Sequence, residues 1–379
     1  MDARLLSTLT GDRGMELAGH RLLTEATGGG EGPVRWGPSP LTADAEPPDD
    51  EGMRIGINGF GRIGRAVLRR ALRTDLDIVA INDITDATIL AHLLKHDSTH
   101  GALDARVSAS AGILEVNGTA IAVSACADPA EIDWRAHGVE LVIDATGRFR
   151  TRDALAGHLK AGARKVLLSA PGKGLDVTIV PGVNDAAYDP VRHEIVSLAS
   201  CTTNCVAPMV KVLHAGFGLV RGFMTTIHAY TGDQMLLDGP HKDPRRARSA
   251  AVNIVPTSTG AARMVGQVLP ELNGRLDGIA IRVPVEDGSI TDLSAQVRRP
   301  VTAEEVNAAF AAAAQEELHG ILRYSTEPLV SRDIIGDAAS CVFDSALTQA
   351  GGDLVKVFGW YDNEWGYANR LVEMAQRMT

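Results

Sequence analysis

The sequence predicts an α/β fold built around a doubly wound parallel sheet, and three stretches support this prediction. A short strand-like run after Met53 leads into the glycine-rich turn GFGRIG at 59–64, and an amphipathic helical pattern follows. A second strand-like run, DIVAIND, ends at Asp83, and VELVIDATGRF at 139–149 reads as a later buried strand. Strands that alternate with helical segments are typical of a parallel sheet covered by helices on both faces.

The length and composition indicate a globular protein with two domains. The chain has 379 residues, of which 45% are hydrophobic and 22% are charged. A formal net charge of −10 argues against a general nucleic-acid binder, because phosphates carry the same sign. No apolar run approaches the roughly 18 residues of a membrane-spanning helix. The four cysteines are too few and too unevenly spaced for a disulfide framework. We therefore expect a cytoplasmic protein with neither nucleic-acid nor membrane partners.

Residues 1–52 differ in composition from the rest of the chain. They hold ten acidic residues against four arginines, and they are rich in glycine and proline. Such a segment has little apolar surface with which to form a core, so we expect a disordered acidic extension. A second interpretation is that translation begins at Met53, immediately before the first convincing strand.

The turn at 59–64 has the spacing of a dinucleotide-binding site. Gly59, Gly61 and Gly64 lie between a predicted strand and a predicted helix, where backbone N–H groups can approach a pyrophosphate. Asp83 follows about twenty residues later, where a carboxylate accepts hydrogen bonds from an adenosine ribose and repels the extra phosphate of NADP. The structural alternative for Asp83 is a carboxylate that caps its own loop.

Three histidines, His92, His96 and His100, have a spacing that on one helix face would suggest a metal site. The segment DSTHG at 97–101 continues a helix poorly, and no cysteine or carboxylate completes a familiar ligand pattern. We therefore predict no metal site here and interpret these histidines as helix-end and loop residues.

The stretch LASCTTNCVAP at 198–208 raises the question of a nucleophile. A strand-like run ends before Cys201, and a helical pattern follows, so Cys201 is expected at a helix N-terminus, where the thiol pKa is lowered. Cys205 is expected one turn further in, on the packed part of the helix. His228, at the end of another strand-like run, is the candidate base. Taken alone, each has a plain alternative as a buried thiol or a buried, hydrogen-bonded histidine.

From Met53 to the C-terminus the chain resembles the phosphorylating glyceraldehyde-3-phosphate dehydrogenases. The matching stretches are INGFGRIGR, ATGRF, SAPGKG, ASCTTNC, TTIHAYTGDQ, HKDPRRAR, PTSTGAA and WYDNEWGY, and they occur in the order typical of that family. Together they span essentially all of residues 53–379 and are highly specific.

The resemblance implies a reaction. The Cys201 thiolate attacks the aldehyde of glyceraldehyde 3-phosphate, hydride passes to NAD, and inorganic phosphate cleaves the resulting thioester to give 1,3-bisphosphoglycerate. His228 corresponds to the base, and a backbone N–H at Cys201 would complete an oxyanion site.

The resemblance also assigns the binding residues. The substrate-phosphate site corresponds to Thr231, Arg246 and Arg282. The inorganic-phosphate site corresponds to Ser200, Thr202, Thr259 and Gly260. The cofactor-binding positions are Gly59, Gly61, Arg62, Ile63, Gly64, Asp83, Thr146 and Asn363. For Asn363 the structural alternative is a helix N-cap before the final helix.

The family's architecture gives expectations for the domains. Residues 53–200 are expected to form a Rossmann-type NAD-binding domain completed by a C-terminal helix at 363–379. Residues 201–362 are expected to form an α+β catalytic domain with a mostly antiparallel sheet. The family is tetrameric, so a homotetramer is expected.

The chain departs from the family at three places, one of them Gly239, where a leucine is common, and two other functions remain as alternatives. Val285-Glu286-Asp287-Gly288 adds negative charge after the Arg282 strand, which would lower phosphate affinity if the carboxylates point inward. Ala127 stands where arginine is common. One alternative is erythrose-4-phosphate dehydrogenase, which hydrolyses its thioester. The other is a redox-sensing or moonlighting binding protein that uses Cys201 as an oxidisable thiol.

Overall fold

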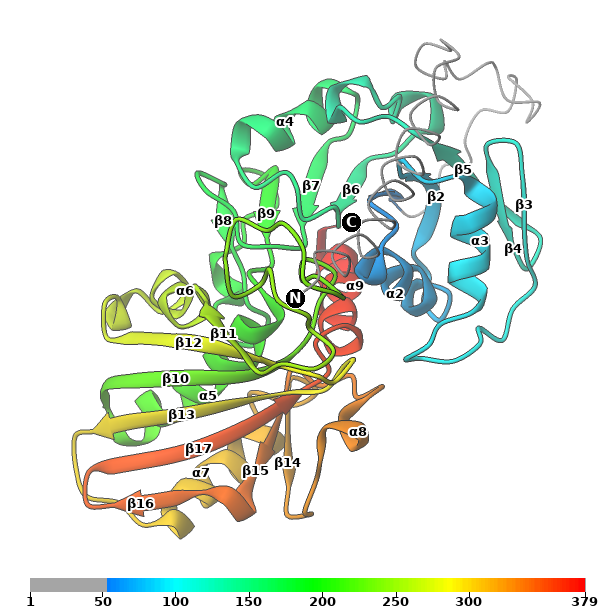
Figure 1. The fold of residues 1–379 in the computed structure, drawn as a ribbon. Helices are drawn as coiled ribbons and strands as arrows, with labels where there is room; N and C mark the ends of the chain where they lie inside the picture. Colours follow the sequence, from blue (N-terminus) through cyan, green and yellow to red (C-terminus); the bar gives the residue numbers. More distant parts are fainter. Residues whose placement is uncertain (1–52, 379) are drawn as a thin grey trace, which may run out of the picture. The chain divides into compact units, whose positions relative to one another are not determined.

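The computed structural model describes residues 53–378, which form two sheets with their covering helices (Figure 1). The disordered extension expected at 1–52 lies outside the described residues. Within the described part of the chain, no helix is both long enough and apolar enough to cross a membrane.

The first sheet is parallel except at one edge. Its strand order is β3-β4-β5-β2-β1-β6-β7-β9-β8, and only the β3–β4 and β4–β5 pairs are antiparallel. Its strands are β1 (Arg54–Asn58), β2 (Asp77–Asn82), β3 (Val107–Ser110), β4 (Ile113–Val116), β5 (Thr119–Ser124), β6 (Leu141–Asp144), β7 (Lys165–Leu168), β8 (Val177–Thr178) and β9 (Ile195–Ser197). Its helices are α2 (Arg62–Ala71), α3 (Ala87–Lys95) and α4 (Arg152–Lys160).

Both faces of this sheet are covered, because the apolar side chains of its central strands pack into separate cores on the two sides. In β6, Leu141 and Ile143 pack with α2 and α3, whereas Val142 belongs to the opposite core with Trp134. In β7, Val166 packs with Leu155 of α4. The alternation of strand side chains between two apolar cores accounts for the near-continuous apolar runs. The predicted doubly wound sheet is confirmed.

The second sheet is mostly antiparallel, as expected. Its order is β11-β12-β10-β13-β17-β15-β14, with β16 paired to β17. Its strands are β10 (Leu219–Ala229), β11 (Val255–Ser258), β12 (Leu276–Val283), β13 (Ser289–Val297), β14 (Leu322–Ser325), β15 (Cys341–Asp344), β16 (Gln349–Gly351) and β17 (Leu354–Tyr361). Its helices are α5 (Cys201–Phe217), α6 (Ala261–Val268), α7 (Ala303–Gln315) and α8 (Ser331–Ile334). Short 3-10 helices lie at Pro129–Glu131, Arg135–His137, Asp185–Ala187, Pro270–Leu272 and Ser345–Leu347.

The last helix, α9 (Trp365–Met378), follows the second sheet in sequence but packs on the first. Leu371 and Met374 are fully buried in the same apolar core as β1, β6 and α2, and α9 runs beside α2 in Figure 1. Arg70 of α2 donates to Asn369 Oδ1 at 2.6 Å. The apolar core beside the first sheet is therefore assembled from two distant parts of the chain.

Candidate active site

The glycine turn between β1 and α2 brings three backbone segments unusually close together. Gly59 has φ +90°, and a Cβ at this position would lie 2.7 Å from the backbone nitrogen of Thr146. A Cβ at Gly64 would lie 2.2 Å from the carbonyl oxygen of Gly59. Only glycine fits at both positions. In contrast, a Cβ at Gly61 would meet nothing within 4 Å, so the N-terminus of α2 borders open space.

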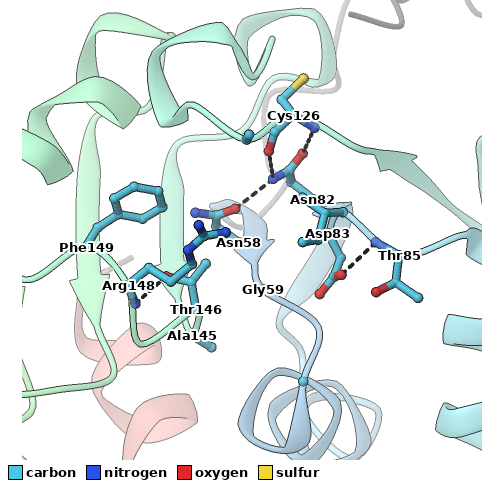
Figure 2. Close-up of a pocket in the computed structure, with 13 residues that line it drawn as sticks. Asn58, Gly59, Asn82, Asp83, Thr85, Cys126, Ala145, Thr146, Arg148 and Phe149 are labelled. Carbon is cyan, nitrogen blue, oxygen red and sulfur yellow. Dashed lines mark hydrogen bonds between the residues drawn. The ribbon is translucent and has the colours of Figure 1, made fainter. Parts of the chain in front are cut away.

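That space belongs to a cavity of about 310 Å³ at the carboxyl ends of β1, β2, β5 and β6 (Figure 2). The cavity is lined by Asn58, Gly59, Gly61, Asn82, Asp83, Ile84, Thr85, Cys126, Ala127, Ala145, Thr146, Arg148 and Phe149. Crevices at this edge of a doubly wound sheet are where dinucleotides bind, and the helix N-terminus beside it suits an anion. The residues present therefore fit a dinucleotide.

Asp83 lies in this lining, and it also holds the turn in place. Its carboxylate accepts the Phe60 N–H at 2.7 Å and the Thr85 N–H at 2.9 Å, and Figure 2 shows the second bond. The loop-capping interpretation of Asp83 is thus correct as far as it goes. Both bonds leave the carboxylate in the cavity wall. The ribose interpretation of Asp83 stays a prediction.

Two buried asparagines beneath the cavity were missed by the sequence interpretation. Asn82 donates to Asn58 Oδ1 at 2.8 Å and to the Cys126 carbonyl at 2.9 Å, and its own oxygen accepts the Cys126 N–H (Figure 2). This network fixes the ends of β1 and β2 against the loop after β5. The only sequence signal was an asparagine at the end of each strand-like run.

A second buried network holds Thr146. Asp144 accepts the backbone N–H and the hydroxyl of Thr146 at 3.1 and 2.7 Å, and an amide N–H of Asn58 at 2.9 Å. His158, fully buried, lies 3.1 Å from the same carboxylate. Trp134 donates to Nδ1 of His158 at 3.0 Å, so the histidine proton resides on Nε2 and points to Asp144. Thr146 is therefore held from below by a fully buried carboxylate.

Cys201 is the first residue of α5, as predicted. Ser200 is the N-cap, and its Oγ accepts the Thr203 N–H at 3.1 Å. Ala199 has φ +55°, a rare value for a residue with a Cβ, and Tyr367 donates to its carbonyl at 3.0 Å. Cys201 is half-buried and contacts the apolar cores of both sheets. Backbone strain of this kind is characteristic of functional turns.

The structure brings Cys201 and His228 together. His228 lies near the end of β10, and its Nε2 is 3.6 Å from the Cys201 Sγ. Its Nδ1 lies 2.7 Å from the Ala229 carbonyl. The same Nδ1 also lies 2.7 Å from Nη1 of Arg282, which can only donate, so two tautomers compete. A proton on Nδ1 directed to Ala229 leaves the Nε2 lone pair facing the thiol, as a general base requires, whereas a bond from Arg282 to Nδ1 puts the proton on Nε2.

The electrostatics of this pair differ from the prediction. Burial raises the pKa of the Cys201 thiol to about 11, although the charge of Arg282 and the Thr202 hydrogen bonds act to lower it. Burial, reinforced by Arg282, lowers the pKa of His228 to about 3. The prediction that the helix N-terminus lowers the thiol pKa is wrong, because the loss of hydration on burial outweighs the effect of the helix N-terminus. The pair is a neutral thiol beside a neutral imidazole.

Arg282 stands next to this pair because β12 runs parallel to β10. The register pairs His228 with Arg282, and the Arg282 guanidinium donates to the Ala229 carbonyl at 2.9 Å. Its Nε is buried and has no hydrogen-bond partner among residues 53–378. An unsatisfied buried guanidinium N–H is an available donor for an anion.

The other two predicted substrate-phosphate residues share a carboxylate that the sequence interpretation missed. Thr231 donates to Asp233, and Arg246 donates to the other oxygen of Asp233 at 2.7 Å. Arg246 also donates to Thr257 at 2.9 Å. In this structure Asp233 therefore accepts from two groups that were predicted to bind phosphate.

The four residues predicted for inorganic phosphate are placed unequally. Thr202 is 5% exposed, and its hydroxyl lies 2.8 Å from the hydroxyl of Tyr361, so it is not free. Thr259 and Gly260 lie at the N-terminus of α6, where Gly260 provides no side-chain cap. Ser200 is half-buried at the start of α5. Two helix N-termini therefore carry this predicted site.

Tyr361 is a further residue that the sequence interpretation did not single out. Its hydroxyl also lies 2.8 Å from that of Thr226, and its ring meets the His228 ring edge-on at 5.8 Å. It is 1% exposed. Tyr361 thus ties the start of α5 to β10 and packs against the candidate base. Its place in the stretch WYDNEWGY was the only signal.

Asn363 is connected to the base through the backbone. Ser289 donates to Asn363 Oδ1 at 2.6 Å and accepts the Ala229 N–H at 3.1 Å. The N-cap interpretation of Asn363 is wrong, because Asp362 instead accepts the N–H groups of Glu364 and Trp365 at the start of α9.

The acidic departure in the loop after β12 does not contact Arg282. Glu286 accepts from Arg332 at 2.6 Å, and Asp287 accepts the Asn363 N–H at 3.2 Å. Asp287 does act on the thiol, because its charge contributes to raising the pKa of Cys201.

The Arg62 side chain does not extend into the dinucleotide cavity, since it binds Glu364 and Asp97. For Arg62 and Ile63, the backbone is what the turn offers to a ligand.

The three histidines do not gather into one site. The rings of His92 and His96 lie 5.0 Å apart, whereas His100 turns toward Glu364 and the ring of Trp365. In the range 53–378, these three do not form a group that could hold a metal.

The fold and this site together define a class of protein. A dinucleotide-binding sheet joined to a cysteine that faces a histidine is the arrangement of a dehydrogenase with a thiol nucleophile. Sequence profiles agree. One described as "Glyceraldehyde 3-phosphate dehydrogenase, NAD binding domain" matches residues 53–152, and one described as the C-terminal domain of the same enzyme matches residues 200–363.

Individual relatives lead to the same family. The chain is 57% identical to "Glyceraldehyde-3-phosphate dehydrogenase" of Geobacillus stearothermophilus over 325 residues, which cover 85% of this chain and 97% of that protein. It is 56% identical to "Glyceraldehyde-3-phosphate dehydrogenase 1" of Bacillus subtilis strain 168 and 55% identical to "Glyceraldehyde-3-phosphate dehydrogenase 2" of Streptomyces avermitilis, with the same coverage. The chain belongs to the glyceraldehyde-3-phosphate dehydrogenase family.

Proposed function

We propose that this protein oxidises and phosphorylates glyceraldehyde 3-phosphate to 1,3-bisphosphoglycerate with NAD. The observation that carries the proposal is the 3.6 Å approach of Cys201 Sγ to His228 Nε2, beside the half-buried Arg282 and a cavity that fits a dinucleotide. The family and its NAD-binding domain supply the substrate class and the cofactor.

In the proposed reaction Cys201 is the nucleophile and His228 is the base. His228 Nε2 accepts the thiol proton, and Cys201 Sγ then forms a bond to the aldehyde carbon. A bound NAD would supply the acceptor for the hydride that leaves that carbon. His228 returns the thiol proton to the oxyanion formed by the attack, takes the hydroxyl proton back as the hydride leaves, and then releases it to solvent, so that a thioester remains on Cys201. An oxygen of inorganic phosphate attacks the thioester carbon, the C–S bond breaks, and the thiolate is restored.

The anion sites follow from the donors near Cys201. Arg282, with its unpartnered Nε, and the pair Thr231 and Arg246 would hold the substrate phosphate. Asp233 would then lose its hydrogen bonds from Thr231 and Arg246, or share these two donors with the phosphate. The start of α5 at Ser200 and Thr202, together with Thr259 and Gly260 at α6, would hold the attacking phosphate.

On the cofactor side, Gly59, Gly61 and Gly64, with the backbone of Arg62 and Ile63, would receive the pyrophosphate. Asp83 would bind the adenosine ribose, with Ala127 in the adjacent wall. Thr146 and Asn363 would contact the nicotinamide side. The bond from Ser289 holds Asn363 Oδ1, which leaves the amide NH₂ group for the cofactor.

We further propose the expected domain division, with residues 53–200 and 363–379 for NAD and 201–362 for catalysis. We also propose a cytoplasmic homotetramer. Supporting the oligomer, the segment at 231–254 carries four large apolar side chains that are at least 70% exposed in the single chain: Leu236, Leu237, Val252 and Ile254.

The test is NADH formation, followed by absorbance, with glyceraldehyde 3-phosphate and with or without phosphate or arsenate. We expect turnover that requires one of the two anions. Anion-independent turnover, or turnover preferring erythrose 4-phosphate, would reject the proposal, and no turnover would favour a redox-sensing role. Cys201→Ser should lower kcat by at least about a thousandfold, whereas Cys205→Ser, at a fully buried position, should retain most activity.

A further inference from the structure

Three ligand-type side chains meet where three separate segments of the chain converge. His100 follows α3, Asp287 lies in the loop between β12 and β13, and Glu364 immediately precedes α9. His100 Nε2 is 3.3 Å from Glu364 Oε2 and 3.9 Å from Asp287 Oδ2. One nitrogen and two carboxylate oxygens from these residues lie within 4.8 Å of one another.

Asp287 supplies the observation that points to a ligand. One of its oxygens, Oδ1, accepts the N–H groups of Gly288 and Asn363 at 2.8 and 3.2 Å. The other, Oδ2, faces His100, and it has no hydrogen-bond partner within residues 53–378. The side chain is 0% exposed. A buried carboxylate oxygen without a partner is costly, so an occupant would stabilise it.

The charge around this group also favours a cation. Asp362 and Glu364 are close enough to act on Asp287, and Asp97 shares Arg62 with Glu364. Arg62 is the one permanent cation that binds Glu364 or Asp97 in these contacts. The cluster therefore has more carboxylates than cationic partners.

We propose that His100 Nε2, Asp287 Oδ2 and Glu364 Oε2 form a binding site for a divalent transition metal, specifically Zn²⁺, with water completing the coordination. An imidazole combined with carboxylates suits Zn²⁺, whereas Mg²⁺ prefers oxygen ligands alone. The side chains of His100 and Glu364 are 10% and 13% exposed. His100 also lines a cavity of about 400 Å³ with Gly336 and Trp365.

The position of this site gives it a role beyond packing. Asp287 binds the backbone of Asn363 through one oxygen and would bind the metal through the other. Glu364 binds Arg62 of the glycine turn. A metal would therefore join the NAD turn to Asn363, two regions that are 301 positions apart in sequence. We expect bound Zn²⁺ to tighten NAD binding.

The test is calorimetric titration of the metal-stripped, full-length protein with ZnCl₂ and, separately, MgCl₂. It is performed in a Cys201→Ser background, because a thiol facing an imidazole also binds zinc. We expect one Zn²⁺ per chain and much weaker binding of Mg²⁺. His100→Gln and Asp287→Asn, two near-isosteric changes in different segments, should each weaken Zn²⁺ binding at least about tenfold, which is about 1.4 kcal/mol.

The matched control is His96→Gln, which removes a neighbouring histidine outside the cluster and should leave Zn²⁺ binding unchanged. Circular dichroism of each variant establishes that the fold is retained. Co²⁺ in place of Zn²⁺ gives a second readout, a visible absorption band that both cluster variants should lose. Absence of Zn²⁺ binding would overturn the proposal and favour a proton shared by Asp287 and Asp362. Equal binding in all variants would also overturn it.

Discussion

Burial and Arg282 act on the Cys201 thiol in opposite directions. Loss of hydration favours the neutral thiol, while the guanidinium charge and the start of α5 favour the thiolate. The result is a pKa of about 11 for Cys201 and about 3 for His228. The imidazole is therefore unprotonated over the whole neutral range, and the thiol must lose its proton before it can attack.

We therefore expect kcat/KM for the aldehyde to rise with pH between about pH 6 and 9. The sign follows from the thiol, because a raised pKa means that the reactive thiolate increases as pH rises toward that pKa. His228→Gln should lower kcat by about 10²–10⁴. Steady-state rates across this pH range give the measurement, with the exposed His319→Gln as control. A wild-type rate that declines over the same range would contradict this account.

The nucleophile and its base were predictable, but their environment was not. Cys201 and His228 are separated by 27 positions, and each follows a strand-like run that ends at the site. Tyr361 and Asp233 were missed because their roles depend on packing and side-chain direction. Tyr361, for example, contacts Thr202, which is 159 positions away in sequence. The direction of the thiol pKa was wrong because sequence reveals a helix N-terminus but not the loss of water around it.

The strand, turn and helix at 54–71 form one unit with two kinds of glycine. Gly59 and Gly64 are required by the fold, because a Cβ at either would overlap backbone atoms. Gly61 is not required by the fold, because its Cβ would project into open space. The GxGxxG spacing predicted the turn, but only the three-dimensional structure distinguishes Gly61 from the other two glycines.

This difference predicts distinct effects for two alanine substitutions in one turn. Gly61→Ala should leave the thermal midpoint near that of the wild type while weakening NAD binding by about tenfold or more, or about 1.4 kcal/mol. Gly64→Ala should lower the thermal midpoint as well, since Gly59 must move. Fluorescence titration with NAD and thermal melts provide the two readouts. If Gly61→Ala bound NAD normally, the pyrophosphate would not lie against this residue.

The described chain is organised as two sheets, and the helix that follows the second sheet in sequence packs on the first. Sequence patterns predicted the first sheet well, because buried parallel strands are continuous apolar runs. The antiparallel order of the second sheet came from family resemblance, since alternating patterns do not specify which strands pair. The docking of α9 on the first sheet is a long-range contact, and its apolar residues alone do not reveal their partner core.

The α9 helix should therefore contribute to cofactor binding from a distance. Leu371→Ala removes a fully buried side chain from the core shared with β1 and α2, and should cost about 2–5 kcal/mol of stability. We expect weaker NAD binding with little change in the reactivity of the Cys201 thiol. Leu354→Ala, at a position that is 56% exposed, is the control. Denaturant unfolding and NAD titration test both points, and a Leu371→Ala protein as stable as the control would refute this account of α9.

The late position of α9 in the sequence also fixes the order in which the protein is completed during synthesis. The strands β1–β9 leave the ribosome before the whole of the second sheet, and Trp365–Met378 follow only after that sheet. Until then, the apolar surface that Leu371 and Met374 later cover has no partner from α9. A nascent chain that ends before residue 365 therefore exposes an apolar surface that α9 later covers. Chaperones bind surfaces of this kind.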